Sequence, residues 1–338
     1  MSKEKRRPRN PQGGSSFVEL LLVTAVLLSV TAALLSVFQG GMMSGHSAHN
    51  ATALQQHVRS GLSLVMRDLL FAGAEVTIGG IPVPTEFRPS GVLYPVTPDD
   101  GKGPIINGQV TDKVTIVYSP IATQTLDNDA ATVYQISGPE GVATNGGQIN
   151  LNTSGSNPTN ATLKAGDVLL IKSNAQGVSA LGYVTGLAGS NLVKFAAGDP
   201  LSLNKPGTTS PIAALNCQNQ GGPSGCSDSA VAFKANILQY YLDDGSSLSA
   251  EDRPVLMRRK NGQSPTPVGL NVEDFQVQYT LEDGSTTGNP TNPVGIRKAQ
   301  VRLVGRSKDK TQGEGGYIRL PVEAQTAVRN LAYAAKQN

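Results

Sequence analysis

Charged residues are scarce in this sequence. Asp, Glu, Lys and Arg make up 16% of its 338 residues, whereas about a quarter is usual for globular proteins. The formal net charge of +3 is concentrated in the first fourteen residues, which hold five basic side chains and one acidic one: Lys3, Lys5, Arg6, Arg7, Arg9 and Glu4. Without these six, the totals of 28 basic and 25 acidic residues fall to 23 and 24. The rest of the chain therefore has no broad positive field, and nucleic acid is not expected as a partner.

Cysteine is also rare, since only Cys217 and Cys226 occur. The segment between them is flexible and turn-forming, so the two thiols can meet. In an oxidising compartment they would form a disulfide that closes a small loop, and in the cytosol they would remain free thiols. Both alternatives stay open, and export of the chain would favour the disulfide. Two sulfur ligands are too few for a metal site.

Recognisable catalytic motifs are missing. The sequence has no nucleophile elbow, Walker loop, dinucleotide-binding glycine motif, HExxH or paired CxxC in a suitable setting. His46, His49 and His57 supply no third metal ligand by their spacing, and we interpret them as solvated side chains. The acidic stretches 127–129 and 243–245 are interpreted as turns rather than calcium loops. We therefore expect no enzymatic activity, no catalytic residue, no cofactor and no bound metal.

Glycine and proline are abundant, with 38 and 21 residues, which favours many turns and a β-rich fold. Short β-prone runs separated by turn clusters follow residue 74, and strands are expected at 113–118, 133–136, 167–172, 192–195 and 231–241. Three turn-rich segments, 138–160, 203–230 and 282–295, are expected to be long surface loops rather than core. No repeat of 20–50 residues is evident.

A clear strand pattern lies near the C-terminus. Residues 296–303 alternate, with Ala299, Val301 and Leu303 on one face and polar residues on the other. Residues 317–322 are expected to pair with this strand in antiparallel fashion, and 323–336 to form a closing helix. Two basic groups are interpreted as solvated strand faces: Arg258, Arg259 and Lys260, and Lys298, Arg302 and Arg306.

One long apolar run dominates the N-terminal region. Residues 17–38 contain a single charged residue, Glu19, and match the roughly 20 residues that a helix needs to cross a membrane. Basic residues precede the run and none follows until Arg59. By the positive-inside rule, the sequence predicts a single membrane span with its N-terminus in the cytoplasm and the rest exported.

The residues before this run carry a more specific signal. A secretory signal peptide has its cleavage site after the apolar segment, whereas Gly13 and Gly14 come before it. The segment GGSSFVELLLVTAVLL resembles the class III leader of type IV prepilins, which a prepilin peptidase cuts after a glycine on the cytoplasmic side. The resemblance implies cleavage after Gly14 and an N-methylated Ser15 as the first mature residue. It departs from the family pattern here, because the first mature residue is usually Phe, Met or Leu.

Glu19 becomes the fifth residue of the processed chain under this resemblance. An ionised carboxylate within a bilayer is costly unless it is paired, and cleavage creates an amine close by. In the family, the equivalent glutamate is thought to pair with the N-terminal amine of a neighbouring subunit and to fix its axial register. The simpler alternative is a glutamate at the interfacial end of a plain membrane anchor.

The helix is expected to continue beyond the span. Gly40, Gly41 and Gly45 lower helix propensity, so we expect a bend or a local break there. An amphipathic half follows at about 46–72, with an apolar stripe at helical spacing that should dock on the remaining domain. This docking stripe consists of Leu54, Val58, Leu62, Val65, Met66 and Leu69.

The expected organisation is thus a 1–14 leader, a 15–74 pilin helix and a 75–338 β-rich extracytoplasmic domain with long loops, an α+β fold. Six segments in order, 163–173, 237–244, 253–260, 268–284, 298–307 and 322–333, resemble a PilW-type minor pilin. The resemblance implies a minor pilin that helps to initiate type IV pilus assembly within a tip complex. It implies as partners the prepilin peptidase, other major and minor pilins, the inner-membrane assembly machinery and, before assembly, the lipid bilayer.

That resemblance places the protein first in the inner membrane and then in a pilus at the cell surface. Two alternatives remain. A type II secretion pseudopilin shares the helix and the processing, and deletion phenotypes would separate it from a pilin. A membrane-tethered binding or adhesin module would use the helix only as an anchor and would not need Glu19.

Overall fold

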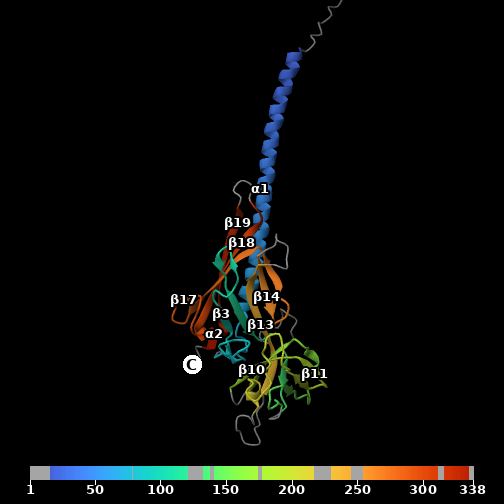
Figure 1. The fold of residues 1–338 in the computed structure, drawn as a ribbon, viewed down its shortest axis with the longest axis vertical. Helices are drawn as coiled ribbons and strands as arrows, with labels where there is room; N and C mark the ends of the chain where they lie inside the picture. Colours follow the sequence, from blue (N-terminus) through green and yellow to red (C-terminus); the bar gives the residue numbers. More distant parts are fainter. Residues whose placement is uncertain are drawn as a thin grey trace, which may run out of the picture.

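The chain forms one long helix followed by a β-rich region, which is compatible with an α+β fold (Figure 1). Figure 1 shows the N-terminal half of the helix extending beyond all the strands. The computed structural model describes residues 16–77, 79–120, 132–137, 141–173, 177–216, 230–244, 254–310 and 316–334.

Helix α1 spans Phe17–Phe71 without interruption. Its 55 residues correspond to a length of about 80 Å at 1.5 Å per residue. The break expected at Gly40, Gly41 and Gly45 does not occur. Each glycine costs only about 1 kcal/mol relative to alanine, and the apolar run before them and the docked segment after them are both helical.

An eight-stranded antiparallel sheet forms the largest part of the β-rich region within the described residues. Its longest strand is β13 (Ala230–Asp243), which pairs with four others, namely β6, β7, β9 and β14. The remaining strands and their bounds are β3 (Val96–Asp99), β6 (Lys113–Tyr118), β7 (Val133–Gln135), β9 (Val168–Ser173), β10 (Ser179–Tyr183), β14 (Val255–Lys260) and β15 (Thr266–Leu270).

A second sheet has the strand order β17-β16-β18-β19, with β19 at one edge. Its strands are β16 (Val272–Leu281), β17 (Thr286–Thr287), β18 (Ile296–Lys310) and β19 (Tyr317–Ala327). β18 and β19 pair in antiparallel fashion, as expected, but 317–322 lies opposite the second half of β18, because Leu303 pairs with Val322 and Lys310 with Tyr317. The closing helix expected from residue 323 is wrong: β19 continues to Ala327 because its side chains alternate between more and less exposed positions, and only the short α2 (Arg329–Ala334) follows.

The remaining strands form three smaller sheets. Two are pairs: β1 (Ile81–Pro82) with β2 (Val92–Leu93), and β4 (Ile105–Ile106) with β5 (Gln109–Val110). The third consists of β8 (Gln148–Asn150), β11 (Gly186–Ala188) and β12 (Leu192–Lys194). Short 3₁₀ turns occur at η2 (Asn160–Thr162), η3 (Ala213–Leu215) and η6 (Pro293–Gly295).

Two segments expected to be surface loops contribute to the core instead. Within 138–160, Ile149 and Leu151 are buried on and beside β8. Within 203–230, Leu203, Ile212 and Leu215 are buried as well. The polar residues between these positions gave the segments a loop-like composition, but widely spaced apolar side chains are enough to anchor a short strand or turn on a neighbouring sheet.

Buried side chains form three clusters, and β13 contributes to all of them. Its Leu238 and Tyr240 belong to the helix core, a cluster that also contains most of the docking stripe of α1. Ala230 and Ala232 belong to a second cluster, built with β7, β8, β9, β10 and β12. Phe233, Ala235 and Ile237 belong to a third, with β1, β2 and parts of β6, β9 and β10. A single strand thus connects all three cores.

Candidate membrane helix and its docking site

The N-terminal half of α1 is exposed along its whole length. Every described side chain from residue 16 to 49 is exposed, including Phe17 at 76% and Leu35 at 56%. Residues 17–38 would extend about 33 Å, close to the ~30 Å hydrocarbon core of a bilayer. By length and composition, this is one helix capable of crossing a membrane.

Polar groups within this half are turned onto the helix itself. The hydroxyls of Thr24, Ser29 and Thr31 donate to backbone carbonyls three or four residues earlier. These internal hydrogen bonds lower the cost of placing hydroxyl groups in an apolar medium. Apart from Glu19, residues 17–38 therefore present a nearly uniform apolar surface.

Glu19 lies in the first turn of α1 and is exposed. A carboxylate is favourable at this end of a helix, where the backbone N–H groups carry partial positive charge. The predicted cleavage residues Gly14 and Ser15 lie outside the described residues, as do Cys217 and Cys226. Of the positions predicted to act in processing and assembly, only Glu19 is placed.

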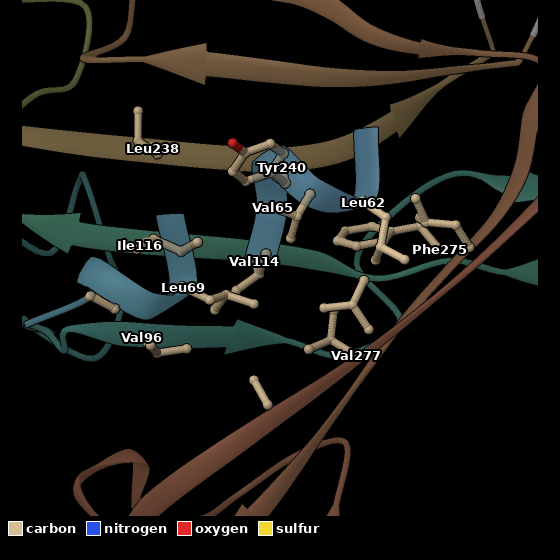
Figure 2. Close-up of a cluster of buried hydrophobic side chains, with 14 of the residues drawn as sticks. Leu62, Val65, Leu69, Val96, Val114, Ile116, Leu238, Tyr240, Phe275 and Val277 are labelled. Carbon is tan, nitrogen blue, oxygen red and sulfur yellow. The ribbon is translucent and has the colours of Figure 1, made fainter. Parts of the chain in front are cut away.

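The C-terminal half of α1 contacts strands of both large sheets. Five residues of the docking stripe, Leu54, Val58, Leu62, Val65 and Leu69, are buried, and Met66 is partly buried against the same core. Figure 2 shows side chains of this helix half among those of β3, β6, β13 and β16. Burial of each large aliphatic side chain is worth about 1.5–3 kcal/mol.

Two glycines allow the helix to approach the strands closely. A Cβ atom on Gly305 of β18 would lie 2.3 Å from Cγ2 of Val58 and 2.8 Å from Cδ1 of Leu54. On the helix, a Cβ on Gly61 would lie 3.1 Å from the carbonyl oxygen of Val268. The absence of side chains at these positions makes room for the docking stripe.

A buried carboxylate links α1 to the large sheet. Asp68 is fully buried, and its Oδ2 accepts hydrogen bonds from the hydroxyl of Tyr240 and, at 3.0 Å, from Nε of Arg258. Nη2 of Arg67 lies 3.2 Å from Oδ1. Arg258 was expected on a solvated strand face, and this expectation is wrong, because its side chain is only 12% exposed and pairs with Asp68.

The surroundings of two tyrosines strongly favour their neutral form. Burial, followed by the nearby charge of Asp68, raises the pKa of Tyr240 far above its usual value. Burial also raises the pKa of Tyr279 on β16, and the carboxylates of Asp112, Asp99 and Asp100 add to the effect. Burial is likewise the main cause of the raised pKa of Asp112. The side chains of Tyr240 and Tyr279 therefore serve as hydrogen-bonding groups and apolar surface, and their hydroxyls do not act as bases.

The far end of α1 is tied to the C-terminal region. Nδ2 of Asn330, in α2, donates to the carbonyl oxygen of Ala72 at 2.9 Å and to that of Phe71 at 3.4 Å. Carbonyl groups at the end of a helix have no partner within the helix, so this side chain satisfies two of them. The docked half is thus held by apolar contacts, by the Asp68 group and by a cap.

Sequence reasoning missed the Asp68 group and the cap. A usable signal was present for the first, because Asp68 lies between Val65 and Leu69 in the docking stripe, where a carboxylate requires a buried partner. Of the histidines, His46 and His49 are exposed, as expected, and Nδ1 of His46 lies 3.2 Å from the amide nitrogen of Asn50.

Comparison of the chain with protein-family models, curated proteins and solved structures gave no match.

Proposed function

We propose that this protein is a minor pilin that acts in the initiation of type IV pilus assembly. The observation that carries the proposal is the division of α1 into an exposed apolar half and a docked half. A helix of this kind can reside in a bilayer and then exchange lipid for the equivalent helices of other subunits. The leader-like segment before it supplies the second support.

Processing is proposed to occur between Gly14 and Ser15 through a prepilin peptidase, with N-methylation of Ser15. The carboxylate of Glu19 would then lie four residues along the chain from the new amine. In a filament, this carboxylate would pair with the N-terminal amine of a neighbouring subunit. An uncompensated charge in an apolar environment costs several kcal/mol, so only subunits in the correct axial register would satisfy it.

The membrane phase of this function follows from the charge distribution. The basic segment 1–14 would remain in the cytoplasm, and the single span at about 17–38 would hold the protein in the inner membrane. Residues from 75 onward would be exported and would later stand at the cell surface. Export would also place Cys217 and Cys226 where a disulfide can form.

A position at the pilus tip is favoured over a repeated position in the shaft. The β-rich region follows a single helix and comprises more than 260 residues, which are difficult to accommodate at every step of a narrow, tightly packed helical fibre. A tip complex with other minor pilins avoids this crowding. The inner-membrane assembly machinery and the major pilin are the further partners that this role requires.

A type II secretion pseudopilin would have the same helix and processing. Deletion of the gene separates the two: loss of pili supports the pilin, and loss of secreted enzymes with pili intact supports the pseudopilin. A tethered adhesin is the remaining alternative, and it requires neither cleavage at Gly14 nor a carboxylate at position 19.

The decisive experiment is mass spectrometry of the N-terminus of the membrane-extracted protein, in cells with and without an active prepilin peptidase. We expect loss of residues 1–14 and one added methyl group on Ser15 only when the peptidase is present. An intact leader, or a cut after Phe38, would reject the pilin proposal.

A second arm tests Glu19 directly. The Glu19→Ala variant should insert in the membrane at the normal level but fail to support pilus assembly. Gln39→Ala is the matched control, because Gln39 is an exposed polar residue near the other end of the span, and this variant should assemble normally. Normal piliation by Glu19→Ala would leave the helix as a simple tether.

A further inference from the structure

A hollow of about 440 Å³ lies on the face of the large sheet that is turned away from the helix core. Val114 and Ile116 of β6 belong to the helix core (Figure 2), and alternation along a strand places Lys113 on the opposite face. The hollow is lined by segment 87–90 and by Asp99, Lys102, Lys113 and Gln239. Its side chains are therefore not those that dock α1.

The carboxylate at this hollow is already paired. Among the described residues that line it, Asp99 alone is acidic. Asp99 lies opposite Lys113 in the register of β3 and β6, but its oxygens accept from Arg88: Oδ1 from Nη2 at 2.8 Å and Oδ2 from Nη1 at 3.3 Å. A bidentate pair of this kind fixes both groups. Arg88 thus largely compensates the charge of Asp99.

Lys113 is a half-buried lysine without a close counter-ion. Within the part of the chain that the structure describes, its ammonium group makes no hydrogen bond and no ion pair, and the same holds for the exposed Lys102. Burial lowers the pKa of Lys113, and the carboxylate of Asp99 opposes this effect. The guanidinium groups of Arg88 and Arg259 lower this pKa further. An anion that entered would stabilise the charged form of Lys113, which burial disfavours.

The charges around the hollow have a positive sum. Three lining residues are basic, namely Arg88, Lys102 and Lys113, and one is acidic, which gives a net charge of +2. Arg259 lies opposite Gln239 on the neighbouring strand β14. It donates to two carbonyl oxygens of the following turn, at 2.8 and 3.1 Å. A concave surface lined mainly by one sign of charge attracts ions of the opposite sign.

We propose that this hollow binds a small organic anion with two or more carboxylate groups, such as a di- or tricarboxylic acid. Its volume falls within the range of about 300–1,000 Å³ that is usual for small-molecule sites. The ammonium groups of Lys102 and Lys113 come from different segments, and each would form a charge-assisted hydrogen bond with a carboxylate. Phe87 and Pro89 offer apolar surface to the carbon skeleton, and the Gln239 amide is a further donor. The inference is independent of the pilin proposal, because it requires neither a membrane nor a filament.

The test is isothermal titration calorimetry of the purified full chain in detergent micelles with sodium citrate, at fixed neutral pH and at an ionic strength held constant with sodium chloride. We expect saturable binding of one citrate per chain. In the Lys113→Met variant, the Kd should rise at least about tenfold, which corresponds to about 1.4 kcal/mol. In citrate-free buffer this variant should unfold at the same temperature as the wild type or at a higher one, because it removes a charge that burial disfavours.

Two further variants test the role of local charge. Asp99→Asn removes the carboxylate that opposes an incoming anion, so its Kd for citrate should fall severalfold. Lys298→Gln is the matched control, because it removes an exposed lysine of β18 that does not line the hollow, and its Kd should equal that of the wild type. An effect of Lys298→Gln as large as that of Lys113→Met would show that only the overall charge matters, and would overturn the proposal.

Competition defines the class of the ligand and its source. Acetate, with one carboxylate, should compete only at a much higher concentration than citrate. A capped peptide of three glutamates carries the same carboxylates as part of a protein chain, and it should bind more weakly than citrate. The proposal is overturned if citrate binding does not saturate, if Lys113→Met binds citrate as tightly as the wild type, if acetate competes equally well, or if only the peptide binds.

Discussion

The two halves of α1 share one backbone and differ in what surrounds them. From Phe17 to Phe38 the helix is exposed and, apart from Glu19, apolar nearly all round, whereas from Leu54 to Leu69 one apolar stripe is buried and the opposite face is polar. A helix apolar all round needs an apolar medium, and an amphipathic helix needs one partner surface. The first half therefore depends on its environment and the second on this chain.

This comparison implies that substitutions in the docked half should change the stability of the β-rich region, and that those in the exposed half should not. Each of the following predictions is measured on the full chain in detergent micelles. Urea unfolding followed by near-ultraviolet circular dichroism is suitable, because the chain has nine tyrosines and no tryptophan.

The largest effect is expected for Asp68→Ala. This change removes the carboxylate that pairs with the mostly buried Arg258 and accepts a hydrogen bond from the Tyr240 hydroxyl. Breaking a buried ion pair from one side costs about 3–5 kcal/mol. The free energy of unfolding should fall by that amount.

Glu323→Ala is the matched control for Asp68→Ala. It removes a carboxylate from a pair with Arg302 in which both side chains are about half exposed, and such pairs are worth about 0–1 kcal/mol. Equal losses in the two variants would show that the Asp68 group does not hold the helix in place.

An intermediate effect is expected for Gly305→Ala. The new methyl group would lie 2.3 Å from Cγ2 of Val58, so the helix or the strand must move. Overpacking of this kind costs about 1–3 kcal/mol. Adding Val58→Ala should restore part of the loss, and a double-mutant cycle would measure the coupling between the two positions.

The comparison between the halves is sharpened by Gly40→Ala. A Cβ atom at Gly40 has no neighbour within 4 Å, so this variant should not destabilise the β-rich region and should favour the helix by about 1 kcal/mol. Loss of stability in Gly40→Ala comparable with that in Gly305→Ala would remove the distinction between the halves.

The smallest effect at neutral pH is expected at Tyr279, where a difference appears only at alkaline pH. Burial raises the pKa of Tyr279 well above the usual tyrosine value of about 10, so above pH 10 the unfolded chain loses this proton while the folded chain keeps it. Stability from this group is constant below that pH and then falls by about 1.4 kcal/mol per pH unit. Tyr279→Phe should unfold with a shallower dependence on pH above 10. An unchanged slope would mean that the hydroxyl ionises without cost in the folded state.

Local patterns were enough to predict much of this fold. The docking stripe was visible as apolar residues at helical spacing, and Lys113–Tyr118 was predicted with the bounds that β6 has. The alternation of Ala299, Val301 and Leu303 correctly identified the buried face of β18. In each case neighbouring residues carry the information, because helix and strand periodicity repeat over a few positions.

What the sequence did not reveal depends on residues far apart. Asp68 and Arg258 are 190 positions apart, and nothing near Arg258 marks it as buried. Nor does any local pattern relate Gly305 to Val58. An unused signal for the tight turns was the dipeptide Asn-Gly, which occurs at 107–108, 145–146 and 261–262. Two of the three asparagines, Asn107 and Asn261, adopt positive φ. Processing, assembly and pilus membership rest on sequence resemblance and remain predictions.

Strand β13 has a consequence for how the protein comes apart. Because its side chains complete three separate cores, opening any one of them uncovers a strand on which the other two depend. Regions that share such an element are expected to unfold cooperatively rather than one after another. Amide hydrogens along β13 should therefore exchange with solvent at a common slow rate set by global unfolding, and a pulling force applied to α1 would meet resistance from all three cores together.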